Sequence, residues 1–182
     1  MKDSLKSKGG CKLSENIKEI ESIITEVIKK EILGCQNRES FNMDDNVSVE
    51  LNLQTAKEIA KFAEDKANEI KVPMVISVVD SGGNIILVHR MEDSLLASID
   101  LSLNKAYTAV SLKMPTDNLK DLCKSDGALY GIQHTNNRIV IFGGGMPFKY
   151  NGKVVGAIGI SGGSVKEDMC VCEYALRKVM TK

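Results

Sequence analysis

The pattern of apolar and polar positions predicts four amphipathic helices. Apolar residues recur at three- and four-residue spacing, which is the period of one helix face, in the segments 14–33, 56–70, 96–112 and 164–180. Pro73 and Pro115 follow the second and third of these helices, where a proline ends a helix. The fourth helix opens with Ser164-Val165-Lys166-Glu167, a capping box in which serine and glutamate both bond to backbone.

Two of the helices have well-defined inward faces. In the helix 56–70 the expected inward residues are Ala56, Ile59, Ala60, Ala63, Ala67 and Ile70. In the helix 96–112 they are Ile99, Leu103, Ala106 and Val110, which places Lys105 and Thr108 on a different flank. A short helix is expected to follow Thr116, whose hydroxyl is well placed to cap it.

Runs of β-branched residues predict an antiparallel sheet. The runs MVISVVD and IILVHRM flank SGGN, where Gly82-Gly83 can adopt the positive φ of a tight hairpin turn. IVIF, at 139–142, is the expected third strand, and Asn151-Gly152 turns the chain into a fourth, KVVGAIGIS. The order αββα, a loop region, then ββα predicts an α/β (α+β) fold in which helices pack against a largely antiparallel sheet.

The first 48 residues are predicted to stand apart from this core. Residues 1–33 contain an amphipathic helix, residues 34–48 read as a flexible polar linker, and the core occupies 49–182. The helix has an apolar stripe made of Ile17, Ile20, Ile24, Val27 and Ile28. Three roles remain open for it: a helix docked on its own domain, a membrane-surface helix, or a peptide that docks in a groove on another protein.

Glycine is concentrated in one part of the chain. Eight of the 15 glycines lie between 143 and 163, beginning with the triplet Gly143-Gly144-Gly145. Backbone must therefore come close to another strand, another subunit or a ligand, and missing side chains could leave a shallow berth for a flat ligand. No lysine followed by serine or threonine completes a phosphate loop, and a strand-end bulge explains the triplet equally well.

Charge and composition exclude several classes. The 24 basic residues balance 24 acidic ones, and no basic stripe interleaved with aromatics is present, so nucleic-acid binding is disfavoured. No apolar run is long enough to predict a transmembrane segment. Five cysteines without a regular framework, and a polar start without a signal-peptide pattern, indicate a cytoplasmic protein.

A set of motifs, taken in their order along the chain, resembles the GlcG/HbpS family (DUF336). This family includes the C-terminal domain of PduO-type cobalamin adenosyltransferases. The resemblance covers about 49–180 and rests on VVDSGG (78–83), HRM (89–91), KAYTAV (105–110), MPT (114–116), FGGGMPF (142–148) and NGKVVGAIGISGG (151–163). It implies a profilin-like domain that forms homo-oligomers, from dimers to octamers. It also implies that haem, or less directly a corrinoid-like cofactor, is the ligand.

The same resemblance bears on location and activity. PduO-type proteins are associated with bacterial microcompartments, and the helix 1–33 resembles the encapsulation peptides that bind microcompartment shell proteins, so the lumen is the implied location. Only 48 residues precede the resemblance, and the adenosyltransferase domain is therefore expected to be absent. An acid-base pair or activated nucleophile cannot be assembled from the sequence, so the chain is expected not to be an enzyme.

The candidate haem residues follow from residue chemistry and from these motifs. His134 lies in a loop-rich stretch and is the better candidate iron ligand, while His89 lies on a strand and is the weaker one. Alternation sends Arg90 to the opposite face from His89, where it would pair with a haem propionate or with Asp80 or Glu92.

Further contacts to a ligand are expected from Lys105, Thr116 and Gly143, Gly144 and Gly145. For Lys105 the alternatives are an ordinary surface lysine or a subunit contact, and for Thr116 the helix cap. Three function classes result: a haem or tetrapyrrole-binding accessory protein, a non-catalytic assembly or cargo protein of a microcompartment, and a small-metabolite enzyme.

Overall fold

The computed structural model describes residues 51–181. The predicted helix 1–33 and the predicted linker 34–48 lie outside the described residues.

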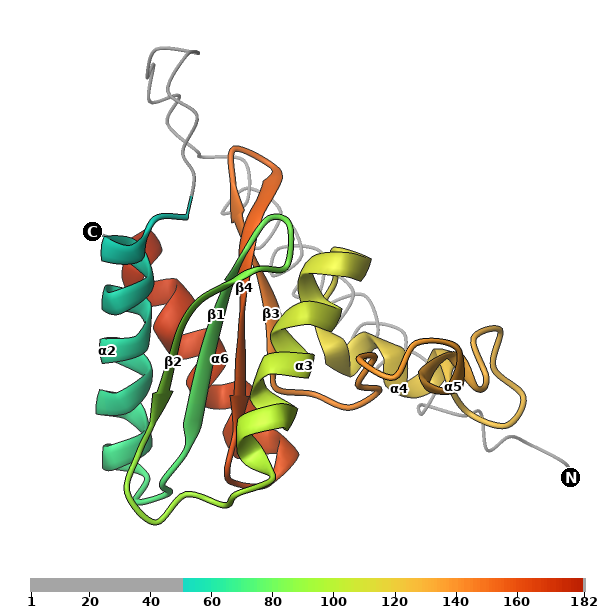
Figure 1. Cartoon of the computed structure of the whole chain (residues 1–182), viewed down its shortest axis with the longest axis horizontal. Coiled ribbons are helices and arrows are strands. Elements are labelled where there is room, and N and C mark those ends of the chain that lie inside the picture. Colours follow the sequence, from blue (N-terminus) through green and yellow to red (C-terminus); the bar gives the residue numbers. More distant parts are fainter. Residues whose placement is uncertain (1–50, 182) are drawn as a thin grey trace, which may run out of the picture. The chain divides into compact units, whose positions relative to one another are not determined.

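A four-stranded antiparallel sheet forms the centre of the domain (Figure 1). Its spatial order is β2-β1-β4-β3, so β2 and β3 are the edge strands. The strands are β1 (Val75–Asp80), β2 (Ile85–Arg90), β3 (Gly145–Tyr150) and β4 (Lys153–Ser161). The predicted α+β class with an antiparallel sheet is confirmed.

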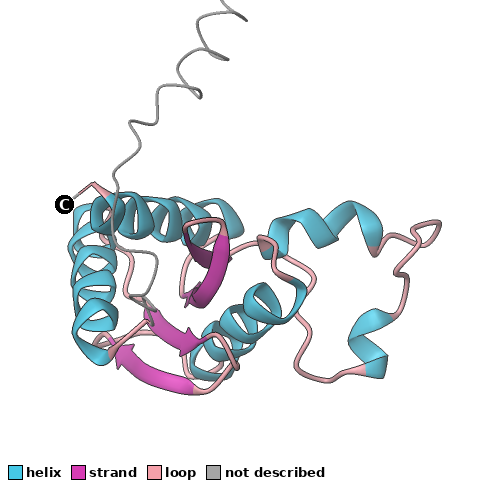
Figure 2. Cartoon of the chain, turned by 90° about the horizontal axis from the view of Figure 1, so that it is seen from above, coloured by secondary structure: helices cyan, strands magenta, loops and turns pink. Residues whose placement is uncertain are grey.

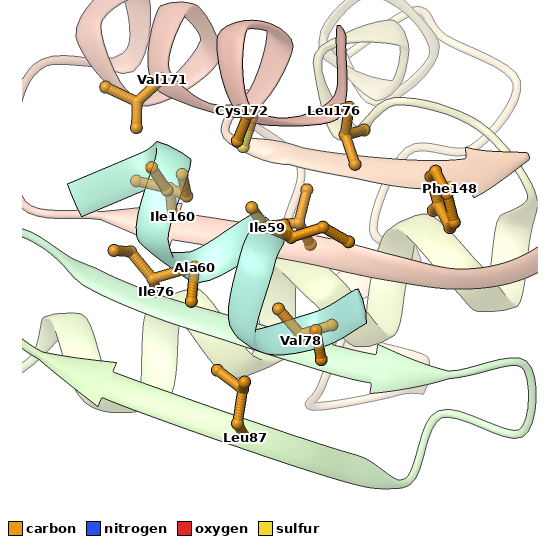
Figure 3. Close-up of a cluster of buried hydrophobic side chains, with 14 of the residues drawn as sticks. Ile59, Ala60, Ile76, Val78, Leu87, Phe148, Ile160, Val171, Cys172 and Leu176 are labelled. Atoms are coloured by element: carbon orange, nitrogen blue, oxygen red, sulfur yellow. The ribbon is translucent and has the colours of Figure 1, made fainter. Parts of the chain in front are cut away.

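Helices α2 (Leu53–Glu69) and α6 (Val165–Met180) cover one face of this sheet. Their apolar side chains meet those of the strands in the main core, as Figure 3 shows for Ile59 of α2, Val171 of α6 and Ile160 of β4. The predicted alanine stripe of α2 is buried as expected. The predicted capping box also forms, since Ser164 and Glu167 bond to each other's backbone at the start of α6.

Both hairpin turns form where they are predicted, at Gly82-Gly83 and at Asn151-Gly152. Asn151 and Gly152 have φ of 47° and 77°, the left-handed pair that a tight turn requires. In the β1–β2 turn Gly83 has φ of 78°, and the carboxylate of Asp80 accepts hydrogen bonds from the backbone of Gly82 and Asn84. The side chain of Asn84 also donates to this carboxylate, and these bonds lower the pKa of Asp80.

Residues 113–142, called the extension below, connect α3 (Ser98–Leu112) to β3. They contain a 3-10 turn (Thr116–Asn118) and two short helices, α4 (Leu119–Leu122) and α5 (Ile132–Thr135). The part that holds α4 and α5 projects away from the sheet (Figures 1 and 2). Its small apolar cluster, centred on Leu119, Cys123 and Ile139, is separate from the main core.

The prediction of a strand at IVIF, 139–142, is wrong. The third strand begins only at Gly145, because the backbone N–H groups before it bond elsewhere. The N–H of Val140 donates to the hydroxyl of Thr108 on α3, and that of Ile139 donates to the carbonyl of Asn136. These residues fasten the extension to α3 instead of extending the sheet.

Helix α3 covers the other face of the sheet and lies almost on its backbone. Gly145 of β3 and Gly159 of β4 are cross-strand partners, and Gly159 is also paired with Ser77 of β1. A Cβ atom at Gly159 would lie 2.0 Å from the carbonyl oxygen of Ser102, and one at Gly145 would lie 2.4 Å from that of Lys105. The strand glycines therefore make room for the helix.

This close approach corrects the predicted inward face of α3. Its buried residues are Ser98, Ser102, Lys105, Ala106, Thr108, Ala109 and Val110, whereas the predicted Ile99 and Leu103 are only half-buried. At such short range small polar side chains fit better than branched apolar ones. Ser102 shares a 2.8 Å hydrogen bond with Ser77, and Ser98 accepts one of 3.1 Å from Ser161.

Replacing Gly159 with alanine should therefore destabilise the domain more than replacing another strand-hairpin glycine. For Gly159→Ala the added methyl group collides with backbone of α3, and we expect a loss of about 3 kcal/mol in the free energy of unfolding. Gly152→Ala is the matched control, because its methyl group would meet nothing within 4 Å and only the positive φ is strained, which costs about 1 kcal/mol. Urea denaturation of both variants measures the difference; equal losses would contradict the close packing.

Candidate functional site

Lys105 and Asp168 form a buried ion pair at the start of β3. Their side chains are 1% and 4% exposed, and the Nζ of Lys105 lies 2.6 Å from Oδ2 of Asp168. Lys105 comes from α3 and Asp168 from the first turn of α6, so the pair joins helices that cover opposite faces of the sheet. Lys105 also donates to the carbonyl of Ile160 at 2.8 Å, and Asp168 accepts from the N–H of Gly163 at 3.1 Å.

The glycine triplet lies around this ion pair. A Cβ atom at Gly144 would lie 2.7 Å from Nζ of Lys105, and one at Gly143 would lie 2.5 Å from the sulfur of Met169. Gly144 also has a φ of 111°, which side-chain-bearing residues rarely adopt. The triplet therefore allows the side chain of Lys105 to reach Asp168 past the end of β3.

Burial at this site disfavours the charged forms of the Asp168 carboxyl and the Cys172 thiol. Burial raises the pKa of the Asp168 carboxyl above its ordinary value, and Lys105 opposes that effect. Burial also raises the pKa of the Cys172 thiol, which donates to the carbonyl of Gly144 at 3.1 Å and therefore stays protonated. The ring of Phe142 lies 5.2 Å from Nζ of Lys105, within cation–π distance, and is partly exposed.

The expectation that missing side chains leave a flat berth at the triplet is wrong for this chain. Gly143, Gly144 and Gly145 are all buried, and the space beside them is filled by Met169, Lys105 and Thr116. The alternatives proposed for Lys105, a surface lysine or a subunit contact, are also wrong because its side chain is enclosed. Among the described residues, these neighbours occupy the space that side chains at the triplet would fill.

Thr116 belongs to the same cluster and does not act as a helix cap. Its hydroxyl accepts a 3.0 Å hydrogen bond from the N–H of Gly145 and donates a weaker one, at 3.4 Å, to the Gly145 carbonyl. No side-chain cap bond forms at the 3-10 turn that Thr116 opens. The hydroxyl thus ties the beginning of the extension to the beginning of β3.

His89 and Arg90 lie on the edge strand β2, and their side chains face opposite sides of the sheet as predicted. Nδ1 of His89 lies 2.5 Å from a carboxylate oxygen of Glu64 on α2, so this imidazole links the edge strand to the helix. Arg90 is exposed on the side that carries α3. The alternative partner Asp80 is instead occupied by the β1–β2 turn.

His134 lies on α5 in the extension and is exposed. Exposed apolar side chains occur on the same extension at Leu122, Tyr130 and Phe142, and Tyr130 is 68% exposed. The extension is held to α3 by Arg138, whose guanidinium stacks 3.6 Å from the ring centre of Tyr107, and by the bonds of Thr108 to its backbone. The candidate residues thus fall into three places: the buried cluster, the β2 edge and the extension.

Sequence reasoning missed the partnership between Lys105 and Asp168. Asp168 is explained locally as a carboxylate near a helix start, where the helix dipole favours it. The two residues are 63 positions apart, and no spacing signal connects them. Among residues 51–181, no group of three or more His, Cys, Asp and Glu side chains is placed to hold a metal ion, and no helix is long and apolar enough to cross a membrane.

The antiparallel sheet and its flanking helices define an α+β domain of the HbpS-like class. Residues 51–177 match the family model described as "Haem degrading protein HbpS-like", and the chain belongs to this family. It is 52% identical over 127 residues to an uncharacterised 15.0 kDa protein of Citrobacter freundii, covering 69% of this chain and 89% of the relative.

A second relative is the corrinoid adenosyltransferase PduO of Salmonella typhimurium. The identity is 36% over 87% of this chain, but the match spans only 46% of PduO. Among solved structures, the PduOC:Heme complex is 38% identical and has a TM-score of 0.69, covering 71% of this chain and 94% of that one. The chain thus matches less than half of the length of PduO, and the family and the fold expected from the motifs are confirmed.

Removing the charge of Lys105 should destabilise the domain strongly. In Lys105→Met the carboxylate of Asp168 stays buried without its cation, which we expect to lower the free energy of unfolding by about 3–5 kcal/mol. The double variant Lys105→Met/Asp168→Asn should recover much of this loss, because a neutral amide needs no counter-charge. Denaturant titrations of the two variants and the unchanged protein measure the effect; no recovery in the double variant would contradict it.

The loss in Lys105→Met should also depend on pH. Burial raises the pKa of Asp168 in the folded state above its unfolded value, so the folded state binds a proton that the unfolded state has released. The stability of Lys105→Met is therefore expected to rise as pH is lowered from about 8 to about 5. Lys105→Met/Asp168→Asn lacks this carboxyl and serves as the control, and parallel pH profiles of both variants would rule out Asp168 as the titrating group.

Proposed function

We propose that this chain binds haem. The observation that carries the proposal is its similarity to the PduOC:Heme complex, which extends over 94% of that structure at 38% identity. Membership in the HbpS-like family, whose description names haem, supports the same ligand. The fold alone would not suffice, because one fold hosts many functions.

Within the described residues, the extension offers the surface best suited to haem. This segment carries the exposed imidazole of His134, a nitrogen ligand that haem iron accepts, and the exposed side chains of Leu122 and Tyr130. The buried cluster does not compete for this role, because Lys105 and Thr116 are 1% and 0% exposed. His89 is a weaker candidate, since Glu64 already engages its Nδ1 atom.

A haem on this surface would need a second wall. Ligand sites usually bury about 70–90% of a small ligand's surface, whereas a projecting segment covers one side of a flat macrocycle. We therefore propose that two copies of the chain enclose the haem between their extensions. This arrangement makes haem binding and homo-oligomer formation interdependent.

Haemin titration of the purified full chain tests the proposal, because the chain has only two histidines. A saturable Soret band is expected, with cobalamin as the arm that tests a corrinoid ligand. His134→Ala should shift the band and weaken binding by at least about tenfold, equivalent to 1.4 kcal/mol. His89→Ala is the matched control and should leave the spectrum unchanged.

Two results would decide against parts of this proposal. A Soret change no larger than that of an unrelated control protein would reject haem binding. An unchanged spectrum in His134→Ala with a changed one in His89→Ala would move the site to the β2 edge.

A band that forms and then fades would indicate the haem degradation that the family description names.

We also propose that residues 1–33 target the protein to a bacterial microcompartment by binding a shell protein. The supporting observation is the stripe that begins with Ile17, Ile20 and Ile24. In addition, the match to PduO covers 87% of this chain, more than residues 51–181 account for, so it reaches into the first 50 residues. Part of the first 50 residues is thus matched in a relative whose name links it to corrinoid metabolism.

A fluorescent reporter fused to residues 1–48 tests this address in a host that forms such compartments. We expect fluorescent foci that coincide with a labelled shell protein, and diffuse fluorescence for Ile20→Asp/Ile24→Asp, because charge on the apolar stripe prevents docking in an apolar groove. The matched control changes the polar residues Lys18→Gln and Glu19→Gln. Diffuse fluorescence of the unchanged fusion would reject the address.

A further inference from the structure

Three lysines surround one hollow at the tip of the β3–β4 hairpin. The hollow has a volume of about 380 Å³ and is lined by Lys113, Lys149, Gly152, Lys153 and Val154. All three lysines are exposed. It lies on the side of the sheet that carries α3, because Lys149 is paired with Val154, whose side chain packs against the cluster under α3.

The backbone around this hollow fixes the positions from which the three lysine side chains extend. Lys113 ends α3 with a φ of 56°, a left-handed conformation that normally favours glycine. Lys149 and Lys153 come from the two strands of the hairpin, and the tight turn at Asn151-Gly152 holds those strands together. A Cβ atom at Gly152 would meet nothing within 4 Å, so the side of the hollow next to the turn is open.

No counter-charge is supplied from the described part of the chain. Between residues 51 and 181, Lys113, Lys149 and Lys153 make no ion pair within 4.0 Å and no side-chain hydrogen bond. Asp80 lines a neighbouring hollow together with Lys153, but its carboxylate is engaged by the β1–β2 turn. Like charges that share a small hollow repel one another, and a bound anion would relieve that repulsion.

In a second lysine-containing hollow, acidic side chains neutralise the lysine charge; this hollow is called the compensated hollow below. Along α2 a hollow of about 450 Å³ contains Lys57 and Lys61, but Glu58 and Asp65 line it too. Lys61 pairs with Asp65 at 2.7 Å. The two hollows are similar in size, contain three and two lysines respectively, and differ in whether acidic side chains line them.

We propose that the hairpin hollow, formed by Lys113, Lys149 and Lys153, binds a small multiply charged phosphate anion. Three ammonium groups match an anion with two or more charges, and lysine acts on phosphate as a point charge. A volume of about 380 Å³ lies within the range of small-molecule sites and exceeds what a single inorganic ion requires. Pyrophosphate and the phosphate tail of a nucleotide share the required chemistry.

Isothermal titration of the full chain with sodium pyrophosphate tests the site, with ionic strength held constant. Saturable binding is expected, and Lys149→Gln/Lys153→Gln should weaken it by at least about tenfold, because each lost charge removes a charge-assisted hydrogen bond. The matched control, Lys57→Gln/Lys61→Gln, removes two exposed lysines from the compensated hollow and should change affinity less than about twofold.

Further titrations distinguish a nucleotide from a free phosphate anion and define the results that would overturn the proposal. Tighter binding of ATP than of pyrophosphate would assign the site to a nucleotide tail, and the reverse would assign it to the free anion. Absence of saturable binding for both, equal weakening in the two double variants, or equal binding of sulfate would overturn the proposal. Haem binding is read from the Soret band in separate samples, so either proposal can fail alone.

Discussion

The close approach of α3 to the sheet is the constraint on which the rest of the domain depends. It requires glycine at the cross-strand pair Gly145 and Gly159, where any side chain would enter the helix backbone. It also explains why α3 presents mainly serine and alanine to the sheet. Because the helix lies so low, the side chain of Lys105 reaches past the end of β3 to Asp168 on the far helical layer.

Much of this fold could be predicted because its signals are local. Helix periodicity, the capping box at Ser164 and the turn at Asn151-Gly152 all depend on residues that are neighbours in sequence. The segment 139–142 has the same β-rich composition as a strand, but composition does not determine whether an N–H bonds to a strand or to a side chain. In this protein the N–H of Val140 bonds to Thr108, and the strand does not form.

The candidate site was predicted only in part, and the reason is distance along the chain. The motifs at 105, 116 and 143–145 do gather in one place, but as a sealed packing unit in which Thr116 bonds to Gly145. The opposite charges of Lys105 and Asp168 each have a local explanation, so the sequence gives no cause to pair them. Glycines that leave room for a neighbouring helix also look, in a sequence, like glycines that leave room for a ligand.

The surfaces proposed here for ligands lie outside the most tightly packed region of the domain. Family membership and the PduOC:Heme structure direct attention to haem, while neighbouring side chains among the described residues fill the space beside the triplet glycines. The extension and the hairpin tip are the parts where exposed imidazole, aromatic and ammonium groups are available. Tight packing around α3 is compatible with exposed ligand-binding groups elsewhere, because few residues belong to both regions.

The attachment of the extension to α3 has an evolutionary consequence. It leaves α3 at Lys113 and returns to the same helix through Arg138 and Val140, which contact Tyr107 and Thr108. Its small apolar cluster packs against Tyr107 and Leu112 of the same helix and is separate from the main core. Insertions, deletions or exchange of its outer part would therefore leave the sheet undisturbed, so descendants of one ancestral scaffold could acquire different ligands by remodelling this appendage alone.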